Sequence, residues 1–250
     1  MIEVKNLYKS YPKRRDHLRK TKLQVLDGVT FYIKKGNWVA LVGESGGGKS
    51  TLSRLLLGLE NIDKGDVLFE GEKLKSWRKE NQGQVSVVFQ DYTSSVNPNF
   101  KIIDVLKEPL RVVYKRASLY EKAVNLMKEV ELPLSLLDCY PHELSAGQLQ
   151  RVCIARAIST KPKFIILDEA ISSLDASIQV HILELLYKLK TKFDMTCLFI
   201  AHDLETVTYL CDEVMFLSNG KIVEQVTTNK LANVQEEYPK KLLKSLIQLI

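Results

Sequence analysis

The sequence predicts an α/β protein in which a parallel sheet carries an inserted helical lobe. Residues 163–167 and 196–201 are short apolar runs that fit buried strands, and residues 178–192 between them fit a helix. This alternation is typical of a parallel sheet with helices on its faces. Before it, residues 98–156 have a predominantly helical pattern that includes an amphipathic helix over 120–130. We therefore expect one domain with an inserted helical lobe.

The N-terminal part of the chain predicts a small antiparallel sheet followed by a buried strand. Residues 2–11 and 25–33 alternate apolar and polar side chains, which indicates strands with one solvent-facing side. Residues 38–42 are a short apolar run that leads directly into glycines, and the leucines of residues 50–59 have helical spacing. At the other end of the chain, residues 236–250 predict a terminal helix.

Composition and charge exclude several classes of protein. No run approaches the roughly 18 apolar residues of a membrane-spanning helix, and the N-terminus does not resemble a secretion signal, so we expect a cytoplasmic location. The four cysteines are scattered without a CxxC pair, which favours isolated thiols over a metal site. The net charge of +6 is spread along the chain, as in a solvated basic surface. Residues 13–22 are denser in charge and fit a mobile excursion or a segment that contacts lipid or nucleic acid.

A glycine-rich loop between the strand 38–42 and the helix 50–59 fits the pattern GxxxxGK[ST]. Such loops turn consecutive backbone amides around phosphate oxygens, and the start of the following helix favours negative charge. The pattern predicts that the Lys49 ammonium binds the β and γ phosphates, that Ser50 is a ligand of Mg²⁺, and that Thr51 contacts the α phosphate. The loop consists of Gly43, Glu44, Ser45, Gly46, Gly47, Gly48, Lys49, Ser50 and Thr51.

Two carboxylates and a histidine follow predicted buried strands. Asp168 and Glu169 end the apolar run 164–167, and His202 follows the strand 196–201. In an open α/β sheet, ligands bind at the carboxyl ends of the strands. We therefore expect all three side chains to serve the bound nucleotide, and we interpret His17, His142 and His181 as structural.

The pentapeptide Leu144-Ser145-Ala146-Gly147-Gln148 narrows the class further. It resembles the LSGGQ signature of the ATP-binding cassette (ABC) ATPases, with Ala146 in place of one glycine. The resemblance covers essentially the whole chain. It implies a P-loop NTPase (RecA-like) core with an antiparallel β subdomain and an inserted helical subdomain. In this scheme residues 1–90 and 157–250 form the core with its β subdomain, and residues 91–156 form the helical subdomain.

The same resemblance implies the roles of the site residues. Glu169 polarises the attacking water, Asp168 supports Mg²⁺, and His202 contacts the γ-phosphate. Gln90 matches the glutamine that senses Mg²⁺, and its alternative is a polar residue at a strand end. Tyr11 is the best candidate for stacking on adenine, although Tyr8 is close by and a core position is the alternative.

Two segments are implied to act across a dimer interface. Ser145, Ala146, Gly147 and Gln148 would bind the γ-phosphate of ATP held by the opposite subunit, and Asp175 of the segment 172–175 resembles the D-loop aspartate. The cofactors are thus ATP and Mg²⁺. Neither subunit is expected to hydrolyse ATP efficiently alone, and the extra methyl of Ala146 is expected to affect the rate or symmetry of closure.

Local motifs place the chain among the ATPases of dipeptide, oligopeptide and nickel importers. Residues 89–98 resemble FQDxxSS[LV]NP, residues 107–110 resemble xEPL, and residues 237–243 resemble the tail motif of that group. The charged excursion after Tyr11 fits the second ATPase of such systems. A cysteine-rich tail is absent from the sequence, which favours the nickel or metal-chelate branch over the peptide branch.

The implied partners are a second, non-identical ATPase, two transmembrane permease subunits and an extracytoplasmic solute-binding protein. The chain would then lie peripherally on the cytoplasmic face of the membrane, and no nucleic acid is expected. Two alternatives remain at this point. One is the ATPase of an efflux pump, which the catalytic motifs do not exclude, and the other is a non-transport ABC ATPase that acts on nucleic acid.

Overall fold

The computed structural model describes residues 1–12, 22–172 and 174–247. Residues 13–21 of the basic segment and Ser173 of the predicted D-loop lie outside them. The described chain divides into two compact units, residues 1–77 with 198–250 and residues 78–197. This division differs from the subdomain bounds expected from the family resemblance, which stay a prediction.

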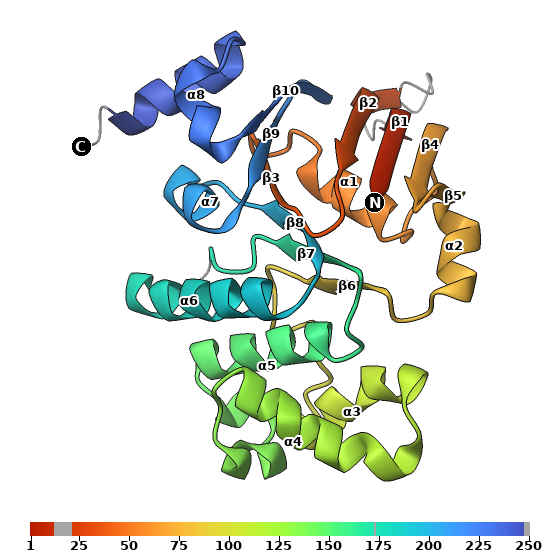
Figure 1. The fold of residues 1–250 in the computed structure, drawn as a ribbon, viewed down its shortest axis with the longest axis vertical. Coiled ribbons are helices and arrows are strands. Elements are labelled where there is room, and N and C mark those ends of the chain that lie inside the picture. The colour runs from red at the N-terminus through yellow and green to blue at the C-terminus, as the bar shows by residue number, and fades with distance from the viewer. Residues whose placement is uncertain (13–21, 173, 248–250) are drawn as a thin grey trace. The chain divides into compact units, whose positions relative to one another are not determined.

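The first unit contains a four-stranded sheet in the order β2-β1-β4-β5 (Figure 1). Residue Ile2 of β1 pairs with Ile33 on one side and with Phe69 on the other, and both pairings are antiparallel. These residues are fully buried, so the apolar alternation of the sequence does face a core. The strands are β1 (Ile2–Pro12), β2 (Lys22–Ile33), β4 (Lys64–Phe69) and β5 (Glu72–Lys73).

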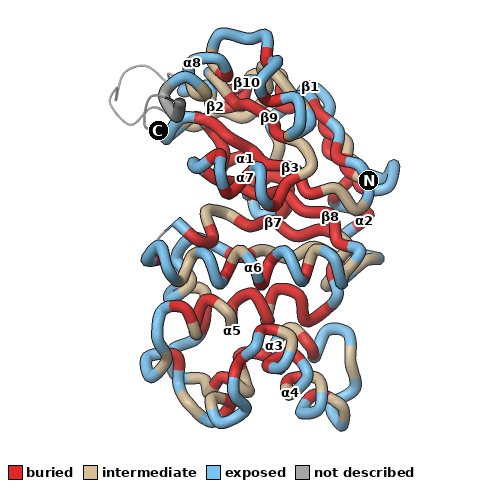
Figure 2. Tube along the Cα trace, turned by 60° about the vertical axis from the view of Figure 1, so that its left-hand side comes forward, coloured by how far each residue is buried: buried red, intermediate tan, exposed pale blue. Residues whose placement is uncertain are grey.

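The same unit contains the strand that leads to the glycine-rich loop. Strand β3 (Trp38–Gly43) pairs in parallel with β9 (Glu213–Ser218), which pairs antiparallel with β10 (Lys221–Thr227). Figure 2 shows β3 and β9 buried along most of their length. Asn219 and Gly220 connect β9 to β10 with positive φ angles of 48° and 74°, which is the geometry of a tight hairpin turn. The other elements of this unit are α1 (Lys49–Leu56), α7 (Leu204–Leu210), η4 (Thr228–Asn233) and α8 (Glu237–Ile247), and α2 (Leu74–Glu80) crosses its boundary.

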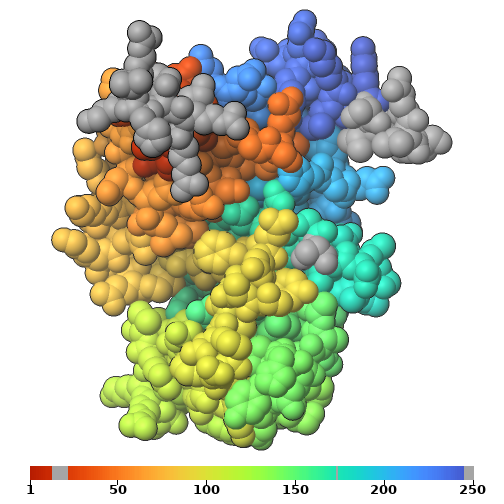
Figure 3. Space-filling model, turned by 180° about the vertical axis from the view of Figure 1, so that it is seen from behind, coloured from red at the N-terminus to blue at the C-terminus, as the bar shows by residue number. Residues whose placement is uncertain are grey.

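The second unit combines two parallel strands with the helices of the lobe. Strand β6 (Val85–Val88) pairs in parallel with β7 (Phe164–Asp168), and Val88 lies opposite Leu167. In Figure 3 the yellow segment that follows β6 and the green helices form a continuous surface. The helices are α3 (Ile102–Val113), η1 (Arg116–Ser118), α4 (Leu119–Glu129), η2 (Leu134–Asp138), η3 (Pro141–Glu143), α5 (Ala146–Ile158) and α6 (Ala176–Lys192).

Strand β8 (Thr196–Ile200) carries the chain from the second unit to the first. At its beginning the Thr196 amide donates to the Lys163 carbonyl, just before β7. Just after its end the Ala201 amide donates to the Leu41 carbonyl in β3. The predicted sequence of strand, helix and strand is therefore present as β7, α6 and β8.

Several predicted bounds differ from the observed ones. The helix predicted over 50–59 ends at Leu56, because Gly58 adopts a left-handed φ of 62° just beyond the helix. The sequence analysis does not predict six of the observed elements, namely β4, β5, α2, α7, β9 and β10. The Asn-Gly pair between β9 and β10 is the signal that points to that hairpin.

Candidate functional site

The glycine-rich loop joins the buried strand β3 to helix α1. All six residues of β3 are buried, and α1 begins at Lys49 with Gly48 at its N-cap position. No described side chain caps this N-terminus, so the first backbone amides of α1 are not satisfied by a side-chain cap. A helix start of this kind favours a bound anion.

At Gly48 both the backbone conformation and the neighbouring strand disfavour a side chain. The φ of 104° at this residue is strained for L-residues. A Cβ atom built there would lie 2.8 Å from the Leu26 side chain and 3.1 Å from the Val25 carbonyl oxygen. Strand β2 therefore packs directly against the end of the loop, and the positive φ favours glycine there.

Lys49 is buried within the loop that precedes it. Its side chain is 4% exposed, and its Nζ donates to the carbonyl oxygens of Gly43 at 2.7 Å and Glu44 at 3.0 Å. A buried ammonium group is costly unless it is hydrogen-bonded, which these carbonyls provide. The loop thus fixes a positive charge next to the start of α1, as phosphate binding requires.

Tyr11 lies against the first turn of α1. Its hydroxyl donates to Glu60 Oε2, and burial together with this hydrogen bond raises the pKa of the phenol, while a hydrogen bond with Thr51 acts in the opposite direction. The Lys9 ammonium lies 5.3 Å from the centre of the Tyr11 ring. Tyr11 is therefore near the phosphate loop, and its stacking on adenine stays a prediction. Ser50 is exposed and Thr51 is buried in this turn.

His202 follows β8 and is exposed. Its neighbour Asp203 caps α7, because its carboxylate accepts from the amides of Glu205 at 3.1 Å and Thr206 at 2.9 Å. Burial opposes the ionisation of Asp203, yet the hydrogen bonds from Thr206 and Glu205 outweigh it and lower the pKa of the carboxyl group. The cap fixes the course of the chain directly after His202. Within the first unit, His202 lines one cavity together with Gly43 and Glu44 of the loop.

The two predicted carboxylates end strand β7 in the second unit. Asp168 is the last residue of the strand, and Glu169 follows it with a left-handed φ of 49°. A non-glycine residue with this backbone is strained, and such strain is concentrated at functional sites. Because Val88 pairs with Leu167, Gln90 and Glu169 each lie two residues beyond a paired position of adjacent parallel strands. Both residues therefore lie just beyond the carboxyl end of this strand pair.

Two glutamines that the sequence analysis missed hold the loop after Glu169. The buried Gln150 of α5 donates its side-chain amide to the Ala170 carbonyl at 2.5 Å. Gln179 of α6 donates to the carbonyls of Ile171 and Leu174, both at 3.0 Å. A polar residue among the buried neighbours of α5 is the signal that points to Gln150.

The signature segment forms the start of α5. The Ser145 hydroxyl accepts from the Gln148 amide at 3.3 Å, and the Gln148 side chain accepts from the Ser145 amide at 2.9 Å. This reciprocal capping box fixes the first turn of the helix. Gly147 is buried, and an added Cβ would lie 2.8 Å from the Ile178 side chain, whereas Ala146 is exposed. The one departure from the family pattern therefore falls at a solvent-facing position of this chain.

The predicted site residues fall into two sets, one in each unit. Tyr11, the phosphate loop and His202 belong to the first unit, while Gln90, Asp168, Glu169, residues 145–148 and Asp175 belong to the second. Asp175 is exposed at the N-cap position of α6, without a side-chain hydrogen bond to that helix among the described residues.

Comparison with known proteins decides the family. The profile described as ABC transporter matches residues 26–172, which is more than half of the chain. The chain belongs to the ABC transporter family. As a member of this family it binds ATP and is an ATPase. The prediction of the family and of the P-loop NTPase fold is confirmed.

The chain is also similar to two ATP-binding proteins of metal import systems and to a solved ABC cassette. The metal-staphylopine import system ATP-binding protein CntF of Staphylococcus aureus (strain NCTC 8325 / PS 47) is 41% identical over 245 residues, which cover 97% of this chain and 98% of CntF. The nickel import ATP-binding protein NikE of Escherichia coli (strain K12) is 45% identical over 214 residues, which cover 83% of this chain and 80% of NikE. The ABC cassette MJ0796, solved as a dimer bound to ADP and Pi, superimposes with a TM-score of 0.79 at 26% identity and covers 91% of this chain and 99% of that one.

Proposed function

We propose that this ABC ATPase is the ATP-hydrolysing subunit of an importer for nickel or a metal chelate. The observation that carries the proposal is the similarity to CntF, which extends over nearly the full length of both chains. NikE, an ATP-binding protein of nickel import, supports the same class of cargo. The motif at residues 89–98 also resembles the corresponding sequence of peptide importers, so dipeptides or oligopeptides are the alternative cargo.

The residues of the two units fit the binding of ATP with Mg²⁺. The phosphates would bind at the start of α1, where no described side chain caps the backbone amides and the buried Lys49 carries a positive charge. Gly48 allows the loop to turn there. Oxygen-bearing side chains are the ligands that Mg²⁺ prefers, and Mg²⁺ usually keeps only one or two protein ligands beside phosphate and water. Ser50, Asp168 and Gln90 would supply such ligands. Among the described residues, no group of three or more His, Cys, Asp and Glu side chains is placed to hold a metal.

Glu169 would act as the general base, and Mg²⁺ would neutralise charge on the phosphates when bound. The strained backbone at Glu169 and the hydrogen bonds from Gln150 and Gln179 around it would keep its carboxylate in a defined direction. His202 would contact the γ-phosphate beside Gly43 and Glu44 of the loop. Ser145 and Gly147 would bind the γ-phosphate held by a second, non-identical ATPase, and Asp175 would lie at the interface.

The proposed partners include two permease subunits and an extracytoplasmic solute-binding protein, which would place the chain on the cytoplasmic face of the membrane. None of the described helices has the length and apolar character that a membrane crossing would require. The surface that we assign to a permease segment is a cavity of about 660 Å³ on the helical lobe. Its cations are Lys107, Arg111 and Arg116, and its carboxylate is Asp104.

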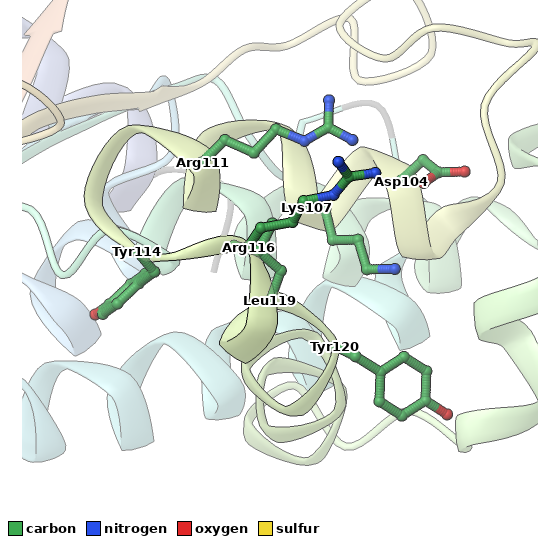
Figure 4. A pocket seen from close by; sticks show the side chains of 7 residues that line it. All are labelled: Asp104, Lys107, Arg111, Tyr114, Arg116, Leu119 and Tyr120. Carbon is green, nitrogen blue, oxygen red and sulfur yellow. The ribbon is translucent and has the colours of Figure 1, made fainter.

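Figure 4 shows the guanidinium groups of Arg111 and Arg116 turned to the same side of this cavity, with Tyr114 and Tyr120 at opposite ends. None of the three cations forms an ion pair within the described part of the chain, and the Lys107 ammonium lies 5.6 Å from the ring centre of Tyr120. An acidic, partly aromatic segment of a permease would complement this surface. Arg111→Glu with Arg116→Glu should reduce copurification of the permeases, while Lys75→Glu on α2 should not.

The cargo is tested by uptake in a strain from which this chain has been deleted. We expect lower uptake of radioactive nickel or of other metals supplied with a chelator, and restoration by the wild-type chain but not by Glu169→Gln. Uptake of labelled dipeptides should be unchanged. Loss of dipeptide uptake with normal metal uptake would overturn the metal assignment in favour of the peptide alternative.

A further inference from the structure

The tail motif at residues 237–243 forms the first turns of α8, in the unit that carries the phosphate loop. Figure 1 shows α8, in dark blue, beside β9 and β10, and α8 contacts β9. The backbone amides of Gln235 and Glu236 donate to the Glu224 carboxylate of β10 at distances of 2.9 to 3.1 Å. This carboxylate fixes the entry to the helix and complements its N-terminal partial charge.

One face of α8 lines the cavity that also contains His202. The cavity has a volume of about 360 Å³, and its lining includes Tyr238, Lys241 and Leu242 of α8 together with Gly43 and Glu44. Residues 238, 241 and 242 have the i, i+3, i+4 spacing that places side chains on one face of a helix. The motif therefore directs a phenol and an ammonium group toward the beginning of the phosphate loop.

Tyr238 is in contact with the first residues of that loop. Burial raises the pKa of its phenol, the nearby Glu44 carboxylate raises it further, and a hydrogen bond with the Glu44 backbone acts against both. The carbonyl of the same Glu44 accepts from Lys49 Nζ at 3.0 Å. A change at Tyr238 would thus be transmitted through one residue to the ammonium that binds phosphate.

Lys241 brings a positive charge to the same cavity. It is exposed and forms no ion pair with any residue that the structure describes, and it shares the cavity with His202. The Glu44 carboxylate is the acidic group of this lining and offsets part of the charge. The γ-phosphate of ATP, placed beside His202, would be attracted by the Lys241 ammonium. ADP lacks this phosphate, and its β-phosphate would lie one phosphoryl group farther from Lys241.

We propose that α8 is part of the nucleotide site: Tyr238 positions the phosphate loop through Glu44, and Lys241 adds a positive charge at the terminal phosphate of ATP beside His202. The proposal rests on the proposed contact between His202 and the γ-phosphate. It assigns to the tail motif a role in sensing whether ATP or ADP is bound. Tyr238 is a positioning residue in this scheme because it acts through Glu44, whereas Lys241 acts on the terminal phosphate itself.

The test compares the affinities of the full chain for ATP and ADP with Mg²⁺, in a Glu169→Gln background that prevents turnover. Lys241→Ala should weaken ATP binding about three- to tenfold and ADP binding less than about twofold, and Lys241→Arg should restore the difference. Tyr238→Phe should weaken the binding of both nucleotides by about two- to fivefold. Lys244→Ala is the matched control, since it removes the same charge from α8 outside the cavity lining.

The role of Lys241 would be overturned if Lys241→Ala and Lys244→Ala changed the affinities for ATP and ADP by the same factors. Unchanged affinities for Tyr238→Phe would overturn the role of Tyr238. Thermal unfolding of each variant checks that the fold is intact, and Lys241→Ala decides the charge effect even where Tyr238→Phe is unstable. Nickel uptake tests the metal assignment separately. If wild-type uptake of nickel is found but Lys241→Ala does not weaken ATP binding selectively, the result counts against the role of α8 and not against the metal assignment.

Discussion

The side-chain amide of Gln150 donates a hydrogen bond of 2.5 Å to the carbonyl of Ala170, the residue that follows Glu169. Gln150 is fully buried in the helix that begins with the signature segment, and its Oε1 has no partner among the described residues. The signature helix and the loop that follows Glu169 are therefore joined by a buried hydrogen bond. A movement of α5 would therefore displace the loop that directly follows Glu169.

Gln150→Leu should leave the Ala170 carbonyl without its partner. An unsatisfied buried carbonyl costs about 1 to 3 kcal/mol, and loss of the unpaired Oε1 offsets part of this cost, so we expect a net loss of about 1 kcal/mol in the free energy of unfolding. ATP turnover should fall while the KM for ATP changes little, because Glu169 is displaced and the phosphate loop is not. Chemical denaturation and steady-state kinetics measure the two effects. The control is Gln82→Leu at an exposed glutamine, and equal behaviour of the two variants would contradict the coupling.

Glu169→Gln should retain ATP binding and lose hydrolysis. Removal of a general base typically lowers the rate by about 10² to 10⁴, whereas the amide keeps the size of the side chain. Phosphate release and nucleotide retention by the purified complex measure these properties. Turnover at the wild-type rate would mean that another residue is the base.

Gly48→Ala should abolish tight nucleotide binding. The new methyl group would meet the Leu26 side chain at 2.8 Å, and the φ of 104° would add backbone strain of about 1 to 3 kcal/mol. Gly71→Ala provides the comparison, because Gly71 also has a positive φ of 87° but has open space around it. Calorimetric titration with ATP should show normal affinity for Gly71→Ala. If Gly48→Ala binds ATP equally well, the loop does not require glycine there.

The pH dependence of stability should reveal the Asp203 cap. Its pKa is lower in the folded chain than the ordinary 3.8, so its carboxylate stabilises the fold above that value, and the contribution is lost as pH falls through the folded-state pKa. Asp203→Ala should therefore cost about 1 kcal/mol at pH 7, and the difference from wild type should shrink below about pH 4. Denaturation of both proteins between pH 3 and pH 7 measures this. A difference independent of pH would show that the charge does not contribute.

The phosphate loop and the buried strands are predictable because their signals are local. An apolar run that leads into GxxxxGK[ST] dictates a strand, a turn and a helix start whatever surrounds them, and β3, Gly48 and α1 follow this pattern. The capping box of Ser145 and Gln148 is equally local, since its residues are three apart in sequence.

Other parts of the site depend on contacts between distant segments. The contact between β2 and Gly48 and the hydrogen bond from Gln150 to Ala170 join residues about 20 positions apart, and no periodic pattern encodes them. The place of α8 beside Glu44 likewise depends on Glu224 of β10, which accepts the amides that begin the helix. A sequence motif identifies residues 237–243, yet only the fold places Tyr238 and Lys241 beside the loop.

The most direct test of the account measures ATP turnover per chain as a function of concentration, with and without the partner ATPase, while sedimentation reports the fraction of dimer. If Ser145 and Gly147 complete the site of a second cassette, turnover per chain rises in proportion to the dimer. Turnover that stays constant at concentrations where the chain is monomeric would contradict the composite site.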